Sequence, residues 1–149
     1  MCIIIDANKM SSILRREVSA EFEPVKKWLE RGHGQVVYGG ALLRELYQSE
    51  GVKRWLLAQY QAGRAIRVND DALEREIQHA RDNLSLKSDD PHVIGVARAS
   101  GARILYTGDK NLIQDFKSQE IINNPPGRIY KHEGAQGILT QDACRGCRG

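Results

Sequence analysis

The stretch Cys2-Ile3-Ile4-Ile5-Asp6 opens the chain with four apolar residues and follows them directly with an acid. A short, continuous apolar run without alternation is typical of a strand buried on both faces. A second such run, Ala102 to Thr107, ends two residues before Asp109. In parallel sheets, ligands bind beyond the carboxyl ends of the strands, so we expect Asp6 and Asp109 to lie at a functional edge.

Strand-like and helix-like segments alternate along most of the chain. This alternation predicts βαβ units, and therefore an α/β fold with a mainly parallel sheet that helices cover on both faces. The expected strands are 2–6, 35–38, 65–68, 103–107 and 128–131, and the expected helices begin near residues 22, 41, 52, 70, 90 and 111.

The composition bounds the class of protein. A length of 149 residues favours one domain, and 41% hydrophobic and 28% charged residues are ordinary for a globular chain. No apolar run approaches the roughly 20 residues of a membrane span. Asp6 and Lys9 interrupt the first apolar run too early for a secretory signal, so we expect a cytoplasmic protein with no membrane partner. A net charge of +3 is compatible with nucleic acid but indicates it only weakly.

The cysteines do not indicate a disulfide framework, because there are three of them. Cys144 and Cys147 form one C-x-x-C motif in a Gly/Arg-rich end, and a zinc site would have to recruit His132 and Cys2. A weakly ordered basic tail over 133–149 is the simpler interpretation, which leaves residues 1–132 as the folded domain.

Two further acids lie in helix-like segments. Glu45 lies beside Leu42 at the border of an apolar stripe, where a carboxylate could face solvent or reach into a cleft. Asp90 precedes Pro91, which is a good helix-capping pattern, although its spacing also places it on the inward face. Asp89 could cap the helix instead.

The joint placement of Asp6, Glu45, Asp90 and Asp109 suggests a metal site, although capping is an alternative explanation for the acids at strand ends. Clustered carboxylates repel one another unless a cation neutralises them. Oxygen ligands suit Mg²⁺ or Mn²⁺, and such ions can activate water against a phosphodiester. Asn8 is an accessory ligand or a cap.

The chain resembles the PIN-domain nuclease family over roughly residues 1–131. The likeness lies in the order and spacing of four segments, since each is weak alone. These are Ile3-Ile4-Ile5-Asp6-Ala7-Asn8, Leu42-Leu43-Arg44-Glu45-Leu46, residues 88–97 with Asp89-Asp90-Pro91-His92, and residues 101–109 with Thr107-Gly108-Asp109. Pro91 and Gly95 depart from the family pattern, which has small alanine-like residues there.

The resemblance implies an α/β/α sandwich that binds one or two Mg²⁺ or Mn²⁺ ions and cleaves single-stranded RNA, leaving a 5′-phosphate and a 3′-hydroxyl. Many small relatives are toxins of toxin–antitoxin pairs, so an antitoxin protein and a homodimer are the implied partners. The implied catalytic and metal-binding residues are Asp6, Glu45, Asp90 and Asp109, with Thr107, Asn8 and Asp89 as accessory candidates.

Two rival functions remain open. The first is a non-catalytic PIN-like module that binds RNA or protein. The second is a phosphohydrolase or phospho-acceptor domain using Asp6, which Asn8 disfavours because such enzymes place a second Asp there. His92 could touch substrate, but a histidine on the surface of a helix is the more ordinary interpretation.

Overall fold

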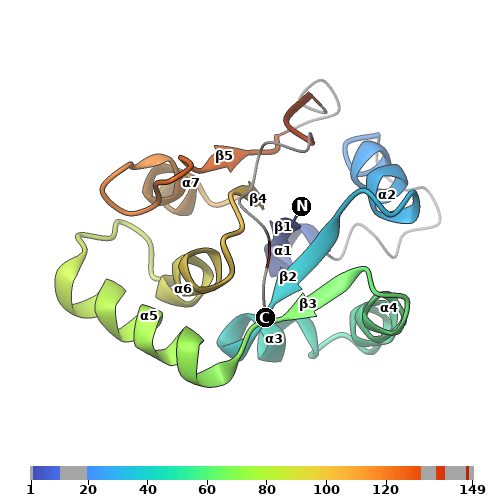
Figure 1. The fold of residues 1–149 in the computed structure, drawn as a ribbon, viewed down its shortest axis with the longest axis horizontal. Coiled ribbons are helices and arrows are strands. Elements are labelled where there is room, and N and C mark those ends of the chain that lie inside the picture. Colours follow the sequence, from blue (N-terminus) through green and yellow to red (C-terminus); the bar gives the residue numbers. More distant parts are fainter. Residues whose placement is uncertain (1, 11–19, 132–136, 140–146, 148–149) are drawn as a thin grey trace.

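A five-stranded parallel sheet forms the centre of the computed structural model, which describes residues 2–10, 20–131, 137–139 and 147 (Figure 1). Every strand pair is parallel, and the order across the sheet is β3-β2-β1-β4-β5. The strands are β1 (Cys2–Ile5), β2 (Gln35–Tyr38), β3 (Ala65–Arg67), β4 (Ile104–Tyr106) and β5 (Arg128–Ile129).

Helices cover both faces of this sheet, which confirms the predicted three-layer α/β/α architecture. In Figure 1, α2 and α4 lie on one side and α5, α6 and α7 on the other. No helix in the described part of the chain is long and apolar enough to cross a membrane. The helices are α1 (Ala7–Met10), α2 (Glu23–Glu30), α3 (Gly40–Leu46), α4 (Glu50–Gln61), α5 (Asp70–Asn83), α6 (Pro91–Ser100) and α7 (Lys110–Lys117).

The central strand β1 fixes the register of the sheet. All four of its residues are buried, as expected for a strand covered on both faces. Ile4 pairs with Leu105 and Ile5 pairs with Tyr106 on β4. The residues that follow these pairs therefore leave the sheet side by side.

Helix α6 is an inner helix, since every residue from His92 to Ala97 is buried. It packs closely on α5, and this contact explains Gly95. A Cβ at this position would lie 2.6 Å from Cγ1 of Ile77, so an alanine would not fit here without a shift.

The described residues include one disulfide, a single bridge that the sequence did not indicate. Cys147 is bonded to Cys2 at the start of β1, with 6.0 Å between the two Cα atoms. Cys2 is therefore not available for the zinc site considered above. Cys144 and His132 lie outside the described residues, as does most of the predicted weakly ordered tail.

Candidate metal site at the carboxyl edge of the sheet

The site lies where the direction of winding reverses. From β1 the chain proceeds to β2 and β3 on one side, and then crosses back to β4 on the other side of β1. The carboxyl ends of β1 and β4 are thus a topological switch point, which is the usual ligand position in open α/β sheets. Asp6 follows β1, and Thr107 and Asp109 follow β4.

Hydrogen bonds connect the two strand ends. The Thr107 hydroxyl donates to Oδ2 of Asp6 at 2.6 Å, and it accepts the backbone N–H of Asp109 at 3.1 Å. Oδ1 of Asp6 accepts the N–H of Ala7 at 2.8 Å. Both Asp6 and Thr107 are buried, so this connection holds the Asp6 carboxylate in a fixed orientation.

Asp109 and Asn8 also have local structural roles. Oδ1 of Asp109 accepts the N–H groups of Asn111 and Leu112, and so caps α7. Asn8 accepts the N–H of Gly108 at 3.3 Å and joins the two loops. The capping explanation for Asp109 is therefore correct, although a carboxylate that caps through one oxygen still has a second oxygen to offer.

Glu45, Asp90 and His92 form a compact group of potential ligands, with one atom from each lying within 4.8 Å of the others. Nε2 of His92 is 3.3 Å from Oε1 of Glu45 and 3.7 Å from Oδ1 of Asp90. Asp90 occupies the N-cap position of α6, yet its side chain makes no capping hydrogen bond. Its carboxylate lies beside Glu45 and His92 instead.

The other three predicted acids all affect the pKa of Asp90. Burial raises the pKa of Asp90, and the carboxylates of Asp6, Asp109 and Glu45 raise it further, against the opposing effect of His92. Asp6 and Asp109 are thus close enough to repel Asp90, although they lie outside the compact group found among the described residues. A cation placed among these groups would relieve the repulsion.

His92 was missed as a site residue by the sequence analysis, and the prediction of a surface histidine is wrong. It is 9% exposed and lies against Glu45 and Asp90. One signal was available: residues 93–97 are small or apolar all round the helix, which is typical of a buried helix. A histidine at the start of such a helix faces the interior of the protein.

Asp115 was also missed, and it holds the segment that leads to Asp90. The Asp115 carboxylate is 1% exposed and accepts the N–H groups of Lys87 and Ser88 at 2.8 and 2.9 Å. The Ser88 hydroxyl donates to it at 2.7 Å. Asp89 is exposed and does not belong to the compact group, which favours Asp90 over Asp89 as the ligand.

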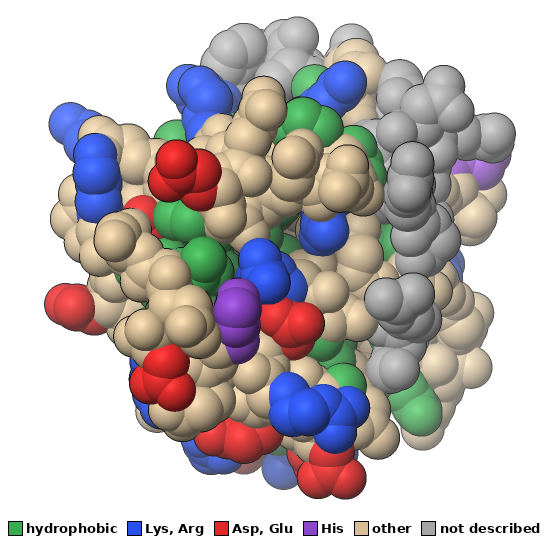
Figure 2. Space-filling model, turned by 60° about the vertical axis from the view of Figure 1, so that its left-hand side comes forward, with side chains coloured by type: hydrophobic (Ala, Val, Ile, Leu, Met, Phe, Trp, Pro, Cys, Tyr) green, Lys and Arg blue, Asp and Glu red, His purple; other side chains and the backbone are tan. Residues whose placement is uncertain are grey.

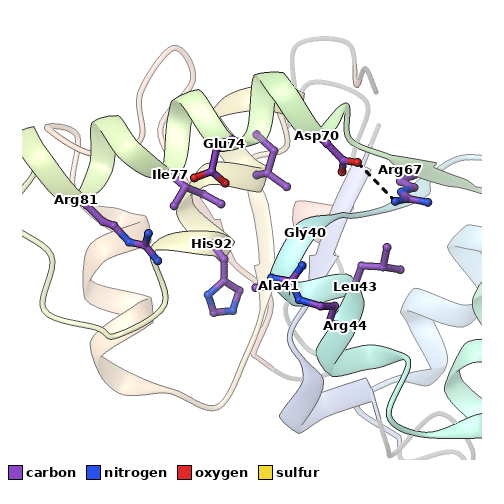
Figure 3. Close-up of a pocket in the computed structure, with 11 residues that line it drawn as sticks. Gly40, Ala41, Leu43, Arg44, Arg67, Asp70, Glu74, Ile77, Arg81 and His92 are labelled. Carbon is purple, nitrogen blue, oxygen red and sulfur yellow. Dashed lines mark ion pairs between the residues drawn. The ribbon is translucent and has the colours of Figure 1, made fainter.

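A pocket of about 450 Å³ opens beside His92, between α3, α5 and α6. Figure 3 shows Arg81 of α5 and Arg44 of α3 on either side of the His92 ring. Arg67 also lines the pocket, but its guanidinium lies 3.8 Å from Asp70. Asp70 and Glu74 line the pocket as well, and basic and acidic side chains are interspersed over the face of the molecule drawn in Figure 2.

The donors fit a divalent cation. Carboxylate oxygens and an imidazole nitrogen are ordinary metal ligands, and Nε2 of His92 is buried without a hydrogen-bond partner in the described part of the chain. An unpartnered buried nitrogen beside two carboxylates is explained if it serves as a ligand. Comparison with protein-family models, with curated proteins and with solved structures finds no match to this chain.

Proposed function

We propose that the chain is a metal-dependent endoribonuclease of the PIN type that cleaves single-stranded RNA. The observation that carries the proposal is the compact group of Glu45, Asp90 and His92, in which burial and the charges of Asp6, Asp109 and Glu45 raise the pKa of Asp90. A cation bound among these carboxylates would offset their mutual repulsion, which explains why they lie close together.

The residues have distinct roles in this proposal. Glu45 and Asp90 hold a Mg²⁺ or Mn²⁺ ion, and Asp6 and Asp109 complete the negative surround from the strand ends. The hydroxyl of Thr107 orients Asp6. A divalent ion bound there supplies an activated water and neutralises charge on the scissile phosphate.

The arginine pocket supports a polyanionic substrate. Arg44 and Arg81 line the pocket beside His92, and neither forms an ion pair within the part of the chain that the structure describes. Guanidinium groups bind phosphate oxygens in a bidentate manner. One phosphate of an RNA strand bound at the pocket would therefore place a neighbouring phosphate near the acids.

The proposal is tested by incubating the purified, metal-free protein with single-stranded RNA and then adding Mn²⁺ or Mg²⁺. We expect cleavage only with metal, and products that carry 5′-phosphate and 3′-hydroxyl ends. Asp6→Asn and Asp90→Asn should each lower the rate by about a hundred-fold or more. Asp82→Asn is the matched control, since Asp82 is an exposed acid on α5.

The rival function predicts another result. If the wild type binds RNA or a protein but cleaves no single-stranded RNA with either metal, the chain is a non-catalytic PIN-like module. Single-stranded DNA should be included as a substrate, because the phosphate contacts proposed here do not distinguish RNA from DNA.

A toxin role follows from the same proposal. Expression in bacteria should then arrest growth, and Asp6→Asn should abolish the arrest. An antitoxin encoded beside the gene should relieve it when co-expressed and should co-purify with the chain. Light scattering of the purified protein tests the homodimer.

A further inference from the structure

We infer that Nε2 of His92 is a metal ligand, and that the site formed by Glu45, Asp90 and His92 therefore prefers Mn²⁺, or a similar divalent transition-metal ion, over Mg²⁺. The inference deepens the proposed function, because it concerns the ion used at the same site. It also stands on separate observations and can be tested without RNA.

The first observation is geometric. Two ligands at about 2.1 Å from one octahedral ion lie about 3.0 Å apart when adjacent and about 4.2 Å apart when opposite. The two distances from Nε2 of His92, 3.3 Å to Glu45 and 3.7 Å to Asp90, lie between these two values, so small movements of the carboxylates would give octahedral spacing. The side chain of Glu45 is 41% exposed, so it has room to adjust around an ion.

The second observation concerns the hydrogen bonding of His92. Nε2 of His92 is buried and has no hydrogen-bond partner within the described residues, although Glu45 lies at ion-pair distance. The contact is short enough for a hydrogen bond but lacks the required geometry. A buried polar atom that points among acids and remains unpaired indicates that a further group belongs between them.

A simpler explanation treats His92 as a protonated counter-ion of Glu45 and Asp90. The two explanations predict opposite effects on metal affinity. A counter-ion competes with a bound cation, so its removal would strengthen metal binding. A ligand contributes to binding, so its removal would weaken it.

The nitrogen donor determines the expected choice of metal. Mg²⁺ favours oxygen ligands, whereas imidazole is a good ligand for transition-metal ions. A site with one imidazole and two carboxylates would bind Mn²⁺ more tightly than a site of carboxylates alone.

The experiment uses the full chain and measures Mn²⁺ binding by electron paramagnetic resonance. The pulsed spectrum of the bound ion should show a directly coordinated ¹⁴N, and His92→Gln should remove this signal. The variant should bind Mn²⁺ about ten-fold more weakly or worse, and Mg²⁺ no more than about three-fold more weakly. His79→Gln, on the exposed face of α5, is the matched control.

Either of two results overturns the inference: bound Mn²⁺ in the wild type without a coordinated nitrogen, or unchanged or tighter Mn²⁺ binding in His92→Gln. The spectrum of the wild type shows whether a nitrogen coordinates the ion even if the variant does not fold. A ¹⁴N signal without RNA cleavage would contradict the proposed function alone. Cleavage without the signal would contradict the histidine ligand alone.

Discussion

The hydroxyl of Thr107 donates a 2.6 Å hydrogen bond to the carboxylate of Asp6 across a separation of 101 residues. The same oxygen accepts the N–H of Asp109. This relationship joins the ends of the two neighbouring strands β1 and β4. It makes Thr107 a positioning residue for the Asp6 carboxylate.

Replacing Thr107 with Val keeps the shape of the side chain but removes both hydrogen bonds. Because Asp6 and Thr107 are buried, we expect the free energy of unfolding to fall by about 2 kcal/mol. For a chain of this length the Tm should fall by roughly 4 to 8 °C. Denaturant unfolding measures the change, and Thr107→Ser should restore most of it. A Val variant as stable as the wild type would show that the hydrogen bonds contribute nothing.

Asp90 should destabilise the metal-free protein at neutral pH. Its pKa in the folded state is raised, so over the range between the unfolded and folded values the folded state binds more protons. Stability therefore falls as pH rises through this range. Asp90→Asn should be more stable than the wild type at pH 7, and the difference should vanish below the ordinary Asp pKa of about 3.9, where both states are protonated.

Divalent metal should make the wild type more stable than Asp90→Asn. At a hundred times its Kd, an ion that binds only the folded state stabilises it by about 2.7 kcal/mol. The wild type should gain this with Mn²⁺, and Asp90→Asn should gain much less. Unfolding curves with and without Mn²⁺ test the point, and an equal gain in both proteins would exclude Asp90 as a ligand.

Asp115 should prove important for stability as well as for the site. In Asp115→Asn, an NH₂ donor replaces one of the two oxygens that accept the N–H groups of Lys87 and Ser88. We therefore expect the free energy of unfolding to fall by about 3 kcal/mol. Asp82→Asn should change stability by less than about 0.5 kcal/mol, because Asp82 is exposed. Asp115→Asn should also lose RNA cleavage at temperatures where it remains folded, because the segment before Asp90 is no longer held in place.

The substitution Gly95→Ala tests the close packing of α6 on α5. Alanine favours helix, yet its methyl group would meet Ile77, so we expect a net loss of about 1 to 3 kcal/mol. Adding Ile77→Ala removes the clashing atom, and the double variant should lose less than the sum of the two single changes. Purely additive losses would show that the two residues do not interact.

Local pattern was enough to predict most of the fold but only part of the site. Asp6 and Asp109 could be placed because each directly follows a strand, and strand ends in a parallel sheet share an edge. The apolar residues 93–97 indicate a buried helix, but the contact of His92 with Glu45 depends on how α6 packs against α3, which local pattern does not show. The Cys2–Cys147 bond, over a separation of 145 residues, has no local pattern at all.

The arginines of the pocket give the last prediction. If Arg44 and Arg81 each bind one phosphate, replacing either with Gln removes one released counterion from RNA binding. The slope of log K against log salt should then become shallower by about 0.7 for each substitution. RNA binding should be measured without divalent metal, so that cleavage does not interfere. Arg54→Gln is the control, because Arg54 is exposed on α4, which lies on the opposite side of the sheet. An unchanged slope in both pocket variants would place the RNA elsewhere on the protein.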